Sequence, residues 1–254
     1  MLAGIAIGLF ILAISFKRIP TDLQRLGVLI QSLKDGHPRP ELVVFGNSVV
    51  MSGIDAEQLA RSLPTVSIGW NCASTGQTET EAFLLSQEMP DTVRLAIYGL
   101  QIRPGEEEQP LHPQKYNTLF MYGFRPTQET RAELISIFGS SVEDVLNRSE
   151  LGQIFDSRWA LRQFIDTFSR RLLRPDLSLD RATFDLFHPQ TYSKRIDEET
   201  TAKLIRKRNL AYTEDPPALA YGTVALSMTL AKKLRSRGVL PVFFFPPIHP
   251  SYRE

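Results

Sequence analysis

The sequence predicts an α/β fold with a parallel β-sheet, and three observations lead to this prediction. Short apolar runs rich in Val, Ile and Phe alternate with helical stretches, and turns that contain Gly or Asn separate them. Such alternation is typical of a parallel sheet whose faces are covered by helices. The chain has 254 residues, of which 43% are hydrophobic, so it is long enough to form a substantial core.

We expect four strands and three helices in this sheet domain, and one further helix before it. Thr21 can cap the first helix, and Gly238 follows the last one. The first helix is interpreted as a connector that precedes the sheet. The strands are expected at 42–45, 65–68, 93–98 and 239–245, and the helices at 21–36, 54–63, 79–88 and 217–237.

Charge and cysteine content exclude several classes of protein. With a formal net charge of +1 and 22% charged residues, the chain lacks the basic excess of a nucleic-acid binder. Its apolar content is also too high for a disordered protein. The single cysteine, Cys72, excludes an internal disulfide and a multi-cysteine zinc cluster. We expect no nucleic-acid partner, no metal and no cofactor.

The N-terminus carries an uncharged apolar run from Leu2 to Phe16 that ends at Lys17 and Arg18. Its length of about fifteen residues is short against the roughly 20 that span a bilayer. We interpret residues 1–18 as a membrane anchor; a secretory signal and a buried core helix are the alternatives. Lys17 and Arg18 favour a cytoplasmic location for the residues after them, which leaves the orientation open.

The remaining chain divides into a sheet domain and an insertion. The connector helix occupies 19–40, the first part of the sheet domain 41–102, and the second part, which we expect to be truncated, 216–254. The roughly 110 residues before the fourth strand are too long for an ordinary connection, so we expect a helical insertion at 103–215. Its clearest helix, 157–173, has an apolar side and an arginine side, which is either solvated or rests on anionic lipid.

The first predicted strand ends at Gly46-Asn47-Ser48, directly before a helical stretch. Ligands of open parallel sheets bind outside the carboxyl ends of the strands, so a hydroxyl at Ser48 is well placed for a nucleophile. The same composition is also common in turns and helix caps, and this structural role is the alternative. The segment from Asn71 to Thr78 follows the second strand and should converge on the same edge.

These two segments resemble the SGNH (GDSL-like) hydrolase superfamily, in particular its envelope-associated branch with the DltD-like and alginate-acetylation proteins. The resemblance lies in residues 45–48, 52–55 and 71–76. It implies a three-layer αβα sandwich of the flavodoxin-like type. It also implies that Ser48 is the nucleophile and first oxyanion donor, and that the Gly76 amide is the second donor.

The resemblance implies roles for other residues near the cleft. Asn47 replaces the more usual aspartate before the serine, and Asn71 should line the cleft with it. Gln101 stands near the position of the family's asparagine after the third strand, so it is the candidate for a third oxyanion donor.

A serine hydroxyl needs a general base, and the family supplies one from an Asp-x-x-His block that normally lies after a further helix and strand. In this chain Asp185 and His188 have that spacing, although they precede the fourth strand. His249 follows the fourth strand and should line the cleft, either in a supporting loop or as the base.

Two functions are compatible with these features of the sequence. The first is a membrane-anchored ester hydrolase or O-acyltransferase, on the periplasmic or extracytoplasmic side, that acts on a cell-envelope glycan with an acyl donor. The second is a non-catalytic protein that binds an envelope glycan or a protein partner through the same cleft. The substrate class comes from the resemblance alone.

Overall fold

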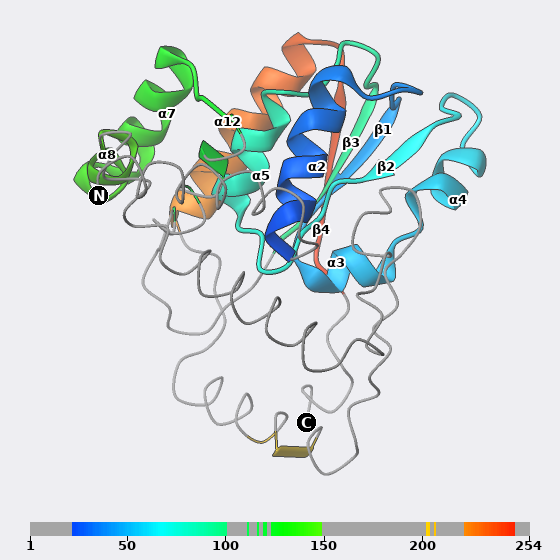
Figure 1. The fold of residues 1–254 in the computed structure, drawn as a ribbon, viewed down its shortest axis with the longest axis horizontal. Coiled ribbons are helices and arrows are strands. Elements are labelled where there is room, and N and C mark those ends of the chain that lie inside the picture. Colours follow the sequence, from blue (N-terminus) through cyan, green and yellow to red (C-terminus); the bar gives the residue numbers. More distant parts are fainter. Residues whose placement is uncertain are drawn as a thin grey trace, which may run out of the picture.

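The computed structural model describes residues 22–100, 111, 116, 119–120, 123–148, 202–203, 206 and 221–246 (Figure 1). The predicted membrane segment at 1–18, the helix at 157–173 and most of the predicted insertion lie outside these residues. None of the described helices is long and apolar enough to cross a membrane.

The core of the described part is a four-stranded sheet in which all strands are parallel. Its strands are β1 (Leu42–Phe45), β2 (Gly69–Asn71), β3 (Leu95–Gly99) and β4 (Leu240–Phe244), and their order is β2-β1-β3-β4. Leu42 of β1 pairs with Gly69 on one side and with Leu95 on the other. The predicted α/β class with a parallel sheet is therefore confirmed.

The position predicted for the second strand is wrong. We expected it at 65–68, whereas β2 is Gly69–Asn71. The apolar residues before it lie next to the start of β1, where the Glu41 carboxylate accepts hydrogen bonds from the amide and the hydroxyl of Ser67. Gly69 lets helix α4 approach closely, because a Cβ at this position would lie 2.0 Å from the carbonyl oxygen of Ala56.

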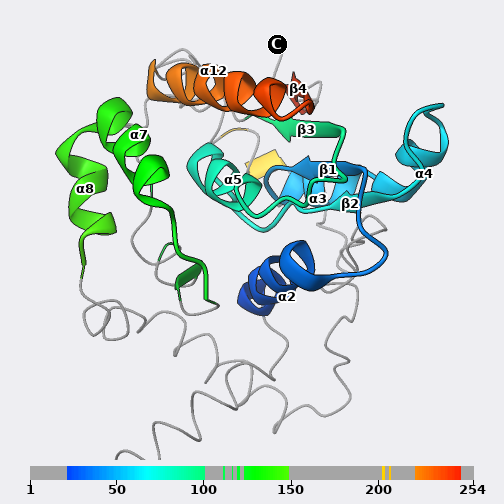
Figure 2. The same cartoon turned by 90° about the horizontal axis from the view of Figure 1, so that it is seen from above.

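Helices cover both faces of the sheet (Figures 1 and 2). The predicted helix at 54–63 is the shorter α4, and another short helix precedes it. One face packs against α2 (Asp22–Asp35), α5 (Glu79–Ser86) and α12 (Tyr221–Ser236), and the other against α3 (Ser48–Gly53) and α4 (Ala56–Arg61).

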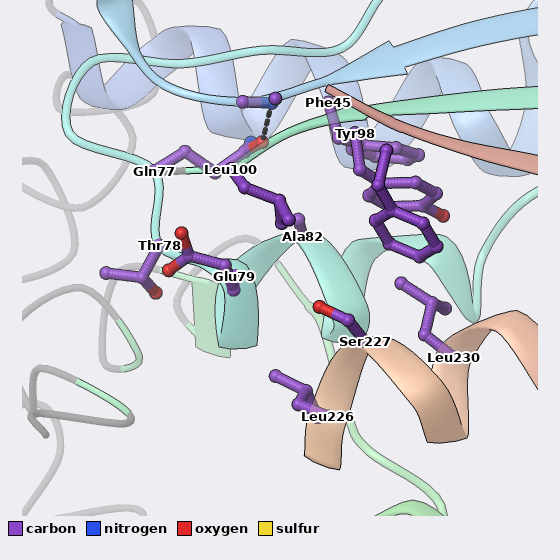
Figure 3. A pocket seen from close by; sticks show the side chains of 13 residues that line it. Phe45, Gln77, Thr78, Glu79, Ala82, Tyr98, Leu100, Leu226, Ser227 and Leu230 are labelled. Atoms are coloured by element: carbon purple, nitrogen blue, oxygen red, sulfur yellow. Dashed lines mark hydrogen bonds between the residues drawn. The ribbon is translucent and has the colours of Figure 1, made fainter. Parts of the chain in front are cut away.

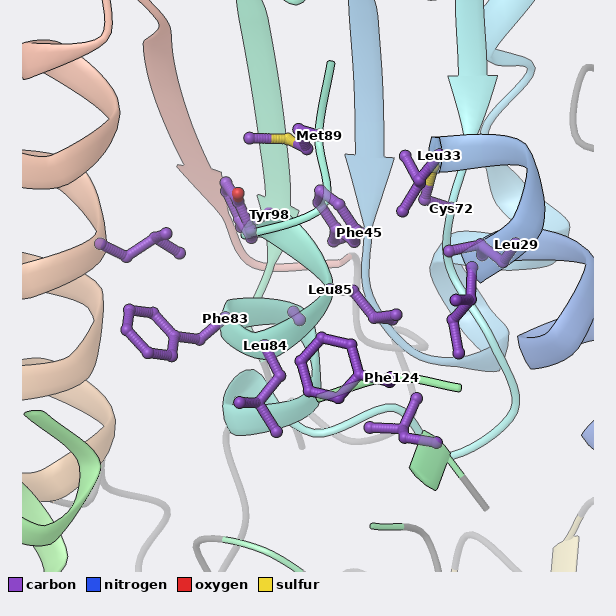
Figure 4. Packing of buried hydrophobic residues seen from close by; sticks show 14 of the residues in the cluster. Leu29, Leu33, Phe45, Cys72, Phe83, Leu84, Leu85, Met89, Tyr98 and Phe124 are labelled. Atoms are coloured by element: carbon purple, nitrogen blue, oxygen red, sulfur yellow. The ribbon is translucent and has the colours of Figure 1, made fainter. Parts of the chain in front are cut away.

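Helix α2 belongs to the core of the domain, a role that its interpretation as a connector did not include. Four of its side chains are buried in the same apolar cluster as Phe45 of β1 and Cys72 (Figure 4). They are Leu26, Leu29, Ile30 and Leu33. Removing this helix would therefore expose a large part of one face of the sheet.

Two described helices fall within the predicted insertion, α7 (Gln128–Phe138) and α8 (Ser140–Leu146). They join the core through buried apolar residues such as Leu134 and Val142. The ammonium of Lys233 on α12 donates a hydrogen bond of 2.8 Å to the Glu133 carboxylate on α7. This part of the predicted insertion thus packs against the sheet domain.

Among the described residues, the helices on the face that carries α3 and α4 cover β1 and β2. Val44, Ile97 and Val242 are paired in register across three strands, so their side chains share this face. Val44 is 0% exposed under the helices, whereas Val242 is 38% exposed and Leu240 is 58% exposed. Half of this face is therefore an apolar surface without a covering helix among the described residues.

We expect the two valines of this row to respond differently to the same substitution. Val44→Thr buries a hydroxyl without a partner and should lower the free energy of unfolding by about 1–3 kcal/mol. Val242→Thr should change it by less than about 0.5 kcal/mol, because its side chain already contacts water. Urea unfolding of both variants measures the difference, and equal losses would show that Val242 is covered in solution.

Candidate functional site

Ser48 is the first residue of α3 and lies at the carboxyl edge of the sheet, three residues after Phe45 ends β1. Its side chain is partly exposed. The hydroxyl makes no hydrogen bond to another described residue. The structure therefore presents this hydroxyl at the edge where ligands of parallel sheets bind.

Asn47 is the helix cap that the structural interpretation of this turn predicts. Its carboxamide oxygen accepts hydrogen bonds from the amides of Val49 at 2.9 Å and Val50 at 3.4 Å. The preceding Gly46 has a φ of 152°, and a Cβ there would come within 2.5 Å of the Val50 side chain. The cap and the glycine together set the sharp turn that leads into Ser48.

The loop after β2 is bonded to the end of β1, as the expected convergence of the two segments requires. The amide of Cys72 donates to the carbonyl of Val44 at 2.7 Å, and the amide of Ser74 donates to the carbonyl of Gly46 at 3.0 Å. These bonds continue the parallel ladder beyond the strands. They bring the segments of Ser48 and Gly76 to the same edge.

Gln77 closes this junction with its side chain, which is 2% exposed. Its carboxamide oxygen accepts a hydrogen bond of 2.7 Å from the Gly46 amide (Figure 3). Its nitrogen donates to the carbonyl of Cys72 and to the hydroxyl of Ser74. Sequence reasoning missed this residue, because nothing in the local pattern shows that its amide is buried.

Gly76 has a φ of 62° and is partly exposed. Neither its amide nor the amide of Ser48 donates a hydrogen bond to any described residue. Backbone N–H groups that are left free beside a nucleophile are what stabilises an oxyanion in acyl transfer. The two amides that the resemblance implies as donors thus have no hydrogen-bond acceptor among the described residues.

Asn71, which was expected to line the cleft, is fully buried. Its carboxamide nitrogen donates to the carbonyls of Met51 at 3.2 Å and Ile54 at 2.8 Å, at the end of α3. Its oxygen accepts from the Ala73 amide at 3.1 Å. In the structure this side chain fastens the loop after β2 to α3.

Arg25 of α2 is a second buried polar residue that sequence reasoning missed. It is 1% exposed and donates to the carbonyls of Asn71 and Ala73, each at 2.7 Å. The signal was present in the sequence, since Arg25 stands four residues before Leu29 and therefore on the apolar side of the helix.

A pocket adjoins the junction at the carboxyl ends of β1 and β3, between α5 and α12 (Figure 3). The connection after β1 leads to β2 on one side of it, and the connection after β2 leads back to β3 on the other side. Open α/β sheets bind ligands at such a reversal of strand order. The pocket is small: its cavity volume is about 10 Å³, which leaves room for about one water molecule. Its walls include Phe45, Gly46, Gln77, Glu79, Ala82, Tyr98, Leu100, Leu226 and Leu230.

The remaining predicted site residues are Gln101, Asp185, His188 and His249, and all of them lie outside the described residues. His37 is described, but it is exposed and precedes β1, at the opposite edge of the sheet from Ser48. In the ranges that the structure describes, no cluster of three or more His, Cys, Asp or Glu residues could hold a metal ion.

Comparisons with known proteins identify no family: no protein-family model, no curated protein and no solved structure matches this chain. The structure shows a parallel four-stranded α/β domain. The resemblance to the SGNH superfamily therefore stays a prediction.

Cys72 offers a test of how firmly the loop after β2 is held. Burial raises the pKa of its thiol to about 12, against an ordinary value of 9.0. The thiolate is the reactive form, so at pH 8 its fraction should be about a thousandfold lower than in the unfolded chain. We expect a disulfide reagent such as DTNB to react only when the loop opens. Rapid reaction of the folded protein would contradict the burial.

Proposed function

We propose that this protein is a serine-dependent ester hydrolase or O-acyltransferase of the SGNH type, with a cell-envelope glycan as its substrate. The observation that carries this proposal is the partly exposed Ser48 at an edge where neither its own amide nor that of Gly76 donates a hydrogen bond to another described residue. The sheet order with helices on both faces supports a three-layer αβα sandwich of the flavodoxin-like type.

The proposed reaction begins with attack of the Ser48 Oγ on the carbonyl carbon of an ester. The new bond from Oγ to carbon forms while the bond to the leaving alcohol breaks, and the serine proton passes through a general base to that alcohol. Water or an acceptor hydroxyl on the glycan then takes the acyl group from Ser48. The Ser48 and Gly76 amides would hold the oxyanion in both steps.

Several assignments in this proposal rest on the sequence. Asp185 and His188 are the proposed carboxylate and base, His249 is the alternative base, and Gln101 is the proposed third oxyanion donor. We place the protein at the membrane, anchored by residues 1–18, with the site on the periplasmic or extracytoplasmic side. This location would keep Ser48 near the envelope polymer.

Labelling of Ser48 tests the proposal. An activated ester or a fluorophosphonate should modify the natural full-length protein at Ser48, as seen by peptide mass spectrometry. Ser48→Ala should lower the labelling rate at least about 100-fold, because it removes the nucleophile.

Ser52 supplies the matched control, since it lies on the same helix and its buried hydroxyl has no hydrogen-bond partner among the described residues. Ser52→Ala should leave the labelling rate unchanged. A wild-type protein that acquires no label would contradict the proposal and favour the non-catalytic binding protein on the same fold.

A further inference from the structure

We propose that Arg25 is a positioning residue of this site: from α2 it fixes the loop after β2, and with that loop the Gly76 amide relative to Ser48. The inference rests on the proposed function for its catalytic consequence. Its structural part, the fixing of the loop, stands on hydrogen bonds that the structure shows directly.

The two carbonyls that Arg25 binds lie on the outer side of β2. The amides of Cys72 and Ser74 donate towards β1, and alternate residues of a strand point their backbone groups to opposite sides. Asn71 and Ala73 therefore direct their carbonyls away from the sheet. The guanidinium supplies there the donors that a neighbouring strand would otherwise supply.

Packing alone does not account for an arginine at this position. Leu26, Val28 and Leu29, which follow it on α2, belong to the apolar cluster, and a Leu or Met would fill the same space without the cost of burying a charge. What an arginine adds is a rigid, planar set of donors that holds two carbonyls at fixed positions. Lysine has one flexible ammonium and does not reproduce that geometry.

The segment held by Arg25, from Asn71 at the end of β2 into the loop after it, contacts both ends of α3. The Asn71 carboxamide donates to the carbonyls of Met51 and Ile54 at its end, and Ser74 donates to Gly46 just before its start. Gly76 lies in the same loop, between Ser74 and Gln77. The Gln77 side chain also accepts a hydrogen bond from the Gly46 amide. Movement of this loop would thus change the distance between the Gly76 amide and Ser48.

Phosphonylation kinetics of Arg25→Lys and Arg25→Met test the catalytic consequence. With a fluorophosphonate, a bond from Ser48 Oγ to phosphorus forms, the P–F bond breaks, and fluoride and the serine proton leave. We expect the maximal rate constant to fall at least about tenfold in both variants, with the half-saturating probe concentration within about twofold of wild type. Lysine should not rescue the rate.

Leu29→Ala is the control for destabilisation, because Leu29 is fully buried on the same side of α2 and contributes no polar group to the loop. It should lower the free energy of unfolding and leave the maximal labelling rate of the folded protein unchanged. If it slows labelling as much as Arg25→Lys does, the effect is one of stability, and the positioning role is wrong.

Amide hydrogen exchange tests the structural part independently of activity. Segment 72–77 should exchange faster in Arg25→Lys than in wild type, and should stay protected in Leu29→Ala. Arg25→Lys keeps the charge and most of the volume, so it carries the test if Arg25→Met does not fold. An unlabelled wild type would refute the proposed function alone, whereas unchanged exchange of segment 72–77 in Arg25→Lys would overturn the inference.

Discussion

The backbone hydrogen bonds between the end of β1 and the loop after β2 are the constraint on which the candidate site depends. One runs from Cys72 to Val44, the last residue of β1 that pairs with β2, and the other runs from Ser74 to Gly46, beyond both strands. Because these hydrogen bonds continue past the strands, the loops that follow β1 and β2 are held in fixed positions relative to each other. Gln77 and Asn71 then occupy the buried polar positions at this junction, where each side chain satisfies several backbone groups.

The sequence predicted the fold class and some elements well, and the reason is the strength of the local pattern. β1 was predicted with its observed bounds, because Leu42 to Phe45 is a continuous apolar run and all four residues are buried. β2 was misplaced, because Gly69-Trp70-Asn71 has no β-branched residue and its pairing is set by contact with β1. The role of α2 was underestimated, since an amphipathic pattern does not show what its apolar side contacts.

The candidate site, like the fold, could be predicted from the sequence only in part. The place of Ser48 follows from the end of β1 and from the helix after it, both of which are visible in the sequence. The roles of Arg25, Asn71 and Gln77 depend on partners far away in the chain, so local spacing does not reveal them. Polar residues inside an apolar pattern are the signal that remains, and Arg25 among the leucines of α2 is an example.

Pro241 belongs to β4, which is an outer strand of the sheet that the structure describes. Leu240 donates to Arg94 and Phe244 accepts from Leu100, so residues 241 and 243 turn their backbone groups outward, where proline lacks an N–H. A strand from another molecule would therefore find an interrupted row of donors. The exposed apolar surface around Val242 lies on the adjoining face of the sheet, and contacts made through such a surface weaken on cooling.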